Sequence, residues 1–196
     1  MERHELTELH YIAPIANVRS MRQLGILSNR RAATVPHQSV AADEIQERRD
    51  NVVVPGGLPL HDYVNLYFHA RNPMMSRRRT RHREICVLRV MPDVLNLPRV
   101  VVTSQNASSR YVRWGAGPRG LAVVNRELAF ARDWRDPDQI QFWKRRSARC
   151  AEVLVPHRLP FEFVTGAYVS CVQAQQDLRT QDPVLPTVID ADLFFQ

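Results

Sequence analysis

The chain has 196 residues, a mass of 22.6 kDa, a formal net charge of +7 at pH 7 and a sequence pI near 10.0. Its hydrophobic content of 44% and charged content of 24% are ordinary for a soluble globular protein, and they predict a single domain over residues 1–196. The basic excess favours an anionic partner, with nucleic acid first, a nucleotide cofactor second and an acidic protein third.

No apolar run is long enough to cross a membrane, and the first eight residues are too charged for a signal peptide. Cys86, Cys150 and Cys171 lie in apolar, strand-like runs without a CxxC motif, which favours reduced core residues in a cytoplasmic protein. The 7 histidines are scattered without ligand spacing, so no metal is expected.

The N-terminal segment predicts a strand followed by a helix. Leu9 to Ile15 is the strand, Asn17 is the expected N-cap, and Gly25 stands at the expected C′ position of the helix. Composition then predicts a loop from Arg30 to Val40. Asp43 can cap a brief helix ending near Arg49.

Adjacent arginines on that brief helix point to different sides, so one of Arg48 and Arg49 can stay in solvent while the other turns inward. The next apolar run, Leu60 to Phe68, contains His61 beside Asp62. A catalytic dyad is one interpretation, but neighbours on a strand face opposite ways, which favours a structural hydrogen-bonding histidine.

The densest basic run is Ser76 to Arg83, which predicts either a solvated loop or a rim that contacts phosphates. Core strands are expected at Glu84 to Val90 and Val100 to Thr103. A strand piece at Tyr111 to Trp114 and a helix after Asp136 follow, and that helix is expected to turn Ile140 and Trp143 inward.

The stretch Cys150 to Pro156 reads as a buried strand that carries one carboxylate, Glu152. Alternation places Ala151, Val153 and Val155 on one face and Glu152 on the other. An edge strand with Glu152 in water is an equally weighted alternative. The remaining chain predicts a strand from Phe163 to Val172 and an extended tail.

Four blocks in one order resemble the DarT family, toxins of toxin–antitoxin pairs that transfer ADP-ribose from NAD onto bases of single-stranded DNA. The blocks are Tyr11-Ile12 with Asn17 and Gly25; Ile45-Gln46-Glu47-Arg48-Arg49; Gly56-Gly57, Leu60-His61-Asp62-Tyr63-Val64, Tyr67-Phe68 and Arg71-Asn72-Pro73-Met74; and Ala151-Glu152-Val153-Leu154-Val155-Pro156.

The resemblance implies an α+β ADP-ribosyltransferase-like fold, in which two small packed β-sheets with flanking helices form an NAD cleft. It implies that Glu152 is the catalytic glutamate and that Arg49 engages NAD. NAD as co-substrate is expected to contact His10, Tyr11, Ile12, Ala13, Ser20, Ser28 and Arg49. The loop between Val35 and Asn51 is expected to fold over it, and residues from Tyr111 to Glu152 to recognise the substrate.

Thymine-modifying members of the family begin with His-x-Thr, where this chain has Tyr11-Ile12-Ala13 with His10 one place earlier. Those members are also more apolar after the Pro-Met pair, which is Pro73-Met74 in this chain, where this chain runs to arginine. Both departures favour the guanine-modifying branch, with thymine or RNA as alternatives. A macrodomain hydrolase is the antitoxin that the family implies.

Cleaving the nicotinamide–ribose bond builds positive charge on the ribose, which a carboxylate such as Glu152 stabilises. Basic and aromatic side chains suited to phosphates and unstacked bases are Arg77, Arg78, Arg79, Tyr111, Trp114, Lys144, Arg145 and Arg146. A protein-arginine acceptor is disfavoured, since Cys150 stands where those transferases carry a second glutamate. A non-catalytic nucleic-acid-binding module, with Glu152 dispensable, is the third hypothesis.

Overall fold

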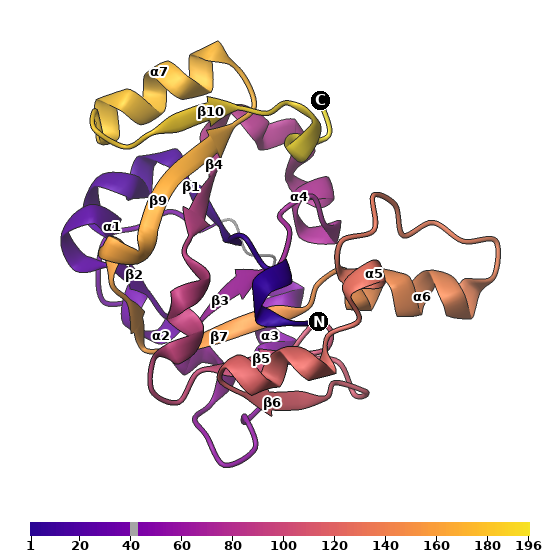
Figure 1. The fold of residues 1–196 in the computed structure, drawn as a ribbon. Helices are drawn as coiled ribbons and strands as arrows, with labels where there is room; N and C mark the ends of the chain where they lie inside the picture. The colour runs from indigo at the N-terminus through magenta and orange to yellow at the C-terminus, as the bar shows by residue number, and fades with distance from the viewer. Residues whose placement is uncertain (40–42) are drawn as a thin grey trace.

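The computed structural model describes residues 1–39 and 43–196, and the side chains of residues 43–45 lie outside the description. It is an α+β structure built on a mixed sheet with the strand order β10-β9-β4-β1-β3-β7-β5-β6, beside a small β2-β8 sheet (Figure 1). The strands are β1 Leu9–Pro14, β2 Ile26–Leu27, β3 Tyr63–Tyr67, β4 Ile85–Val90, β5 Val101–Thr103, β6 Trp114–Ala116, β7 Glu152–Pro156, β8 Arg158–Leu159, β9 Val164–Val169 and β10 Thr187–Ile189.

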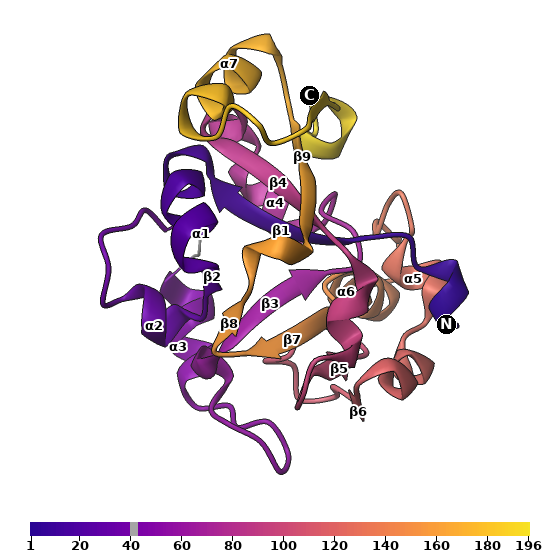
Figure 2. The ribbon, with the colours of Figure 1, turned by 60° about the vertical axis from the view of Figure 1, so that its left-hand side comes forward.

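The large sheet consists of two halves that meet at one place. Strand β1 pairs with β4 from Leu9 to Pro14, and β3 pairs with β7 over its whole length. In the described part of the chain, β1 and β3 pair at one position, His10 opposite Tyr67. The halves therefore diverge from this joint (Figure 2), and they correspond to the two sheets that the resemblance implied.

Short helices flank the sheets and fill the connections. The α-helices are α1 Val18–Leu24, α2 Asn29–Ala32, α3 Asp43–Asp50, α4 Pro73–Arg78, α5 Arg126–Ala129, α6 Gln139–Ala148 and α7 Val172–Gln181. The 3-10 helices are η1 Arg3–Glu5, η2 Ile15–Asn17, η3 Leu60–Asp62, η4 Arg79–Glu84, η5 Pro92–Asn96, η6 Pro118–Val123, η7 Phe161–Phe163 and η8 Asp192–Phe194. Helix α7 lies with β10 at one end of the molecule, while α6 projects from its side (Figure 1).

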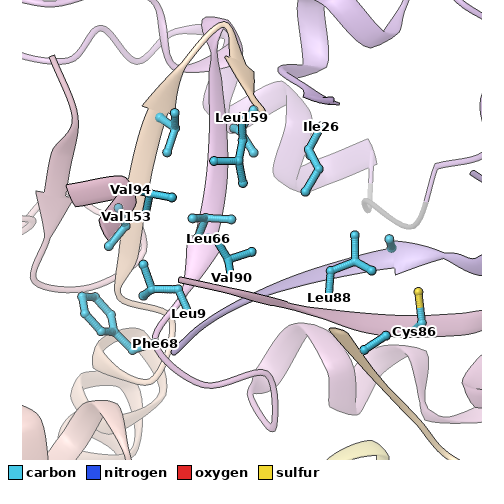
Figure 3. Close-up of a cluster of buried hydrophobic side chains, with 14 of the residues drawn as sticks. Leu9, Ile26, Leu66, Phe68, Cys86, Leu88, Val90, Val94, Val153 and Leu159 are labelled. Carbon is cyan, nitrogen blue, oxygen red and sulfur yellow. The ribbon is translucent and has the colours of Figure 1, made fainter. Parts of the chain in front are cut away.

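The main core fills the angle between the two halves. Leu9, Leu66, Leu88 and Val153, from four neighbouring strands, are fully buried and lie close together (Figure 3). Apolar burial of this kind contributes about 25 cal/mol per Å² of surface removed from water. Since those side chains alternate along each strand, their polar neighbours point to the opposite faces, and this is how Glu152 is directed away from the main core.

Several predictions from the sequence are confirmed. The expected strands correspond to β1, β4, β5 and β7, and Ala151, Val153 and Val155 share the main core as predicted. Arg48 is exposed while Arg49 is buried. Gly25 ends α1 with φ +79, a conformation that favours glycine, and a Cβ at this position would also clash with the Leu159 carbonyl oxygen.

Other predictions need correction. Part of the expected Arg30–Val40 loop is α2, and Val40 lies outside the described residues, as does the side chain of Asp43, which was expected to cap the next helix. Asn17 occupies the N-cap position of α1 without a capping bond, because its amide bonds elsewhere. The basic run from Ser76 to Arg83 is helical: it spans the end of α4, which Asn72 caps by accepting from the Met74 and Met75 N–H groups, and most of η4.

Three further differences concern the second half of the chain. Residues 172–181 form α7, where a strand end and an extended tail were expected. Ile140 and Trp143 are both 58% exposed, so the predicted inward face of α6 is wrong. Cys86 and Cys150 are buried free thiols, whereas Cys171 is half-buried at the N-cap of α7. Among the described residues, no helix has the length and apolar composition needed to cross a bilayer.

Candidate active site

The centre of the site is an ion pair between Glu152 and Arg49. Both guanidinium Nη atoms donate to the carboxylate, with Nη1 3.0 Å from Oε1 and Nη2 3.1 Å from Oε2. Glu152 is 0% exposed and Arg49 is 6% exposed. A forked pair in this geometry is strong and directional, and each partner prevents the other from being a buried, uncompensated charge.

The two elements that carry this pair are fixed by the sheet. Glu152 opens β7 opposite Tyr67 of β3, and its backbone N–H donates to the Thr103 hydroxyl of β5 at 3.0 Å. Arg49 lies in the last turn of α3, which packs against η3 just before β3. The joint between the half-sheets, at Tyr67, therefore adjoins the carboxylate.

Burial governs the titration of this neighbourhood. It would lower the pKa of the Arg49 guanidinium, but the adjoining Glu152 carboxylate outweighs it and raises that pKa. Burial and then Glu152 raise the pKa of the Tyr67 phenol, and the same two causes raise the pKa of the Cys150 thiol to about 12. Arg49 is thus charged near pH 7, while Tyr67 and Cys150 are neutral.

A cavity of about 600 Å³ lies beside the ion pair, a size typical of small-molecule and cofactor sites. Arg49 lines it, whereas its fully buried partner Glu152 does not. The walls come from β1, α1, α2, the segment 35–39, α3, η3, β3, α4, the loop after β5 and α6. Lining residues include Tyr11, Asn17, Ser20, Gly25, Asn29, His37, Gln38, Gln46, His61, Asn65, Met74, Arg77, Arg78, Asn106, Ser109, Trp143, Arg146, Ser147 and Cys150.

Four of the residues expected to contact NAD line this cavity: Tyr11, Ile12, Ser20 and Arg49. Ala13 is fully buried in the main core, and Ser28 is fully buried as well. The Ser28 hydroxyl has no hydrogen-bond partner among the described residues.

His10 forms hydrogen bonds through both ring nitrogens at the joint between the half-sheets. Its Nδ1 accepts the Ala70 N–H at 2.8 Å, so its Nε2 carries the proton and donates to Glu8 at 2.9 Å. Arg89 and Tyr168 also donate to Glu8. Both ring nitrogens of His10 are therefore occupied by the fold, and His10 does not line the cavity.

The residues expected to bind nucleic acid divide into two groups. Arg77, Arg78 and Arg146 line the cavity. The others lie outside its lining: Arg79 donates to the Ser76 carbonyl, Arg145 pairs with Asp136, Trp114 packs against a small cluster around Leu154, Tyr111 is 85% exposed, and Lys144 is exposed.

Sequence reasoning missed several lining side chains. Trp143 is one of them: the sequence predicted that it faces the core, but it lines the cavity. Its spacing of three residues from Arg146 places both on one side of α6, which is the signal that could have identified it. His61 pairs with Asp50 at 2.8 Å and not with Asp62, which pairs with Arg30 at 3.0 Å. Asn17 carried no chemical signal beyond helix capping. No three His, Cys, Asp or Glu side chains gather as a metal site among the described residues.

Two half-sheets that diverge from a buried arginine–glutamate pair beside a nucleotide-sized cavity are the arrangement of an ADP-ribosyltransferase fold. The family model described as "ssDNA thymidine ADP-ribosyltransferase, DarT" matches residues 10–190. The chain belongs to the DarT family.

Known proteins agree with this assignment. A DNA ADP-ribosyl transferase of Thermus aquaticus is 29% identical, with 91% of this chain and 83% of that protein covered. A Thermosipho africanus transferase–glycohydrolase fusion protein is 23% identical over 96% of this chain, which spans about half (49%) of that protein's length. The solved structure of Thermus sp. 2.9 DarT in complex with ADP-ribosylated ssDNA has a TM-score of 0.83 at 24% identity, covering 97% of each chain, and therefore supports the same fold.

Proposed function

We propose that residues 1–196 form one ADP-ribosyltransferase domain that transfers ADP-ribose from NAD onto a base of single-stranded DNA and releases nicotinamide. The observation that carries this proposal is the buried Glu152–Arg49 pair at the wall of the cavity. Solved complexes of Thermus sp. 2.9 DarT contain NAD+ in one structure and ADP-ribosylated ssDNA in another, which supports both substrates.

The chemistry follows from the properties of the pair. Loss of nicotinamide leaves positive charge on the ribose carbon, and the Glu152 carboxylate stabilises that charge from a site with little water. The same carboxylate can take the proton from the attacking base nitrogen. Since Glu152 is 0% exposed and bound by Arg49, the pair must open for the substrate to reach the carboxylate, and the guanidinium fork then suits the diphosphate.

For the acceptor we propose guanine, with thymine as the alternative. Arginine recognises guanine by donating two hydrogen bonds to O6 and N7, and Arg77 lines the cavity. The absence of the His-x-Thr motif at Tyr11-Ile12-Ala13 supports the same choice. An unpaired strand presents the base without the few kcal/mol needed to extrude it from a duplex.

The test is mass spectrometry of short oligonucleotides incubated with the protein and NAD, each containing one candidate base in an otherwise adenine strand. We expect a gain of one ADP-ribose on the guanine strand. A gain confined to thymine would replace guanine, and a gain confined to matched RNA would replace DNA. Glu152→Gln should abolish the gain while DNA binding remains. Binding without any gain in the unaltered protein would favour a non-catalytic module.

We further propose a toxin role, countered by an ADP-ribosyl glycohydrolase antitoxin of the macrodomain type. The Thermosipho africanus relative, in which transferase and glycohydrolase are fused, supports this pairing. A cytoplasmic site of action fits a target in cellular DNA. Expression of the chain should arrest bacterial growth, and co-expression of a DNA ADP-ribosyl glycohydrolase should restore it. Arrest by Glu152→Gln would contradict the role.

A further inference from the structure

His61 has one ring nitrogen without a hydrogen-bond partner in the part of the chain that the structure describes. Its Nδ1 lies 2.8 Å from Asp50 Oδ1, and a carboxylate can only accept, so Nδ1 carries the proton. In the neutral ring, Nε2 is then an acceptor. This nitrogen is buried and has no hydrogen-bond partner among the described residues.

The surroundings keep the ring neutral. Burial lowers the pKa of His61, and the guanidinium groups of Arg49 and Arg30 lower it further, against the opposing pull of Asp50. These groups come from α3 and α2, the two helices packed against η3, and Asp62 of η3 is itself paired with Arg30. The imidazole is therefore unprotonated near pH 7.

His61 is also one of the residues that line the cavity. It lines the cavity together with Arg49 and Gln46 of α3, and its partner Asp50 follows Arg49 directly. An unpaired buried acceptor destabilises a protein unless something supplies a donor. Because Nε2 is already removed from water, only the incoming donor loses hydration when that hydrogen bond forms.

We propose that His61 Nε2 accepts a hydrogen bond from the bound dinucleotide substrate, either from a ribose hydroxyl or from the nicotinamide carboxamide. Asp50 is the positioning residue that holds the proton on Nδ1. No other side chain of η3 offers an acceptor to the cavity, since Leu60 is apolar and Asp62, which pairs with Arg30, is not a lining residue. The inference rests on the proposed use of NAD and assigns one contact within it.

The experiment measures the affinity of the full chain for ADP-ribose and for carba-NAD+, whose nicotinamide bond resists cleavage, by titration calorimetry at pH 7.5. We expect His61→Phe to weaken binding about 3- to 10-fold, the effect of one hydrogen bond. His61→Gln, which keeps an acceptor, should be intermediate. Asp50→Ala should weaken binding in the same direction, because Nδ1 no longer holds the proton.

The two ligands separate the possible donors. An equal loss for both ligands identifies a hydroxyl of the ADP-ribose part, and a loss confined to carba-NAD+ identifies the carboxamide. Unchanged affinity for both ligands in His61→Phe overturns the proposal, provided that its melting temperature matches that of the control His4→Phe, an exposed histidine. If the unaltered protein binds neither ligand, the proposed use of NAD fails instead.

Discussion

At the residue scale, the Arg49–Glu152 pair makes a prediction about stability as well as activity. Arg49→Ala leaves Glu152 0% exposed without its cation, which should destabilise the fold by about 3–5 kcal/mol. The double variant Arg49→Met/Glu152→Gln removes both charges and should recover most of that loss. Urea unfolding of the unaltered protein, Arg49→Met, Glu152→Gln and the double variant measures the coupling free energy.

If the Arg49–Glu152 pair only stabilised the fold, the double variant would be as stable as the unaltered protein and would still be active. We expect the double variant to be stable but inactive in the oligonucleotide assay. Arg49→Lys provides the matched control, because it keeps the charge without the fork. It should retain stability better than Arg49→Ala and lose most transfer.

At the scale of elements, two basic residues near the end of α6 differ in their position relative to the cavity, and the sequence alone does not predict that difference. Arg146 lines the cavity, while Lys144 is exposed outside its lining. Arg146→Ala should weaken binding of single-stranded DNA and reduce the salt slope of log K by about 0.7, the value for one phosphate contact. Lys144→Ala, the matched control, should change neither. Fluorescence titrations at several salt concentrations would show this, and equal effects would contradict it.

Asn17 connects two elements that shape the cavity. Its amide donates to the Gln38 carbonyl at 2.8 Å and accepts the Gln38 N–H at 3.0 Å, as a paired strand would. Asn17→Ala should release residues 35–39 from the cavity wall and raise the KM for NAD several-fold, with kcat changed less. Asn17→Asp, which can still accept, should be intermediate. Faster proteolysis within residues 35–39 would accompany the change.

How much the sequence could predict depends on the kind of signal each element carries. Strands such as β1, β4 and β7 were predictable because apolar alternation and proline ends are local. The local sequence cannot decide whether Glu152 is buried, because its burial depends on Arg49, which lies 103 residues away. Helix α7 gives a weak helical pattern, since Ala174 and Leu178 are its buried residues and its core-facing stripe is therefore short. The side-chain partners of Asn17 and His61 are tertiary and gave no local pattern.

At the scale of the whole molecule, the two half-sheets meet at a polar joint. His10 and His69 lie edge to face with ring centroids 5.5 Å apart, and His10 pairs with Glu8. Burial, and then the neighbouring Arg149, lower the pKa of His69 to about 3. Hydrogen bonds from His10 and Arg89 overcome the effect of burial and lower the pKa of Glu8 to about 2. Acid should therefore weaken the connection between the halves.

The sign of the pH effect follows from proton counts. Unfolded His69 gains its proton near pH 6.5, whereas the folded residue gains it near pH 3, so stability falls as pH decreases through this window. The slope from His69 is at most about 1.4 kcal/mol per pH unit. Glu8 contributes a further loss between about pH 4.5 and pH 2.

Urea unfolding between pH 7.5 and pH 4 should show declining midpoints. In His69→Leu the decline should be shallower, even if the variant is less stable at pH 7.5. The exposed His4→Leu should keep the original slope, and an unaltered slope in His69→Leu would show that this joint does not control acid stability.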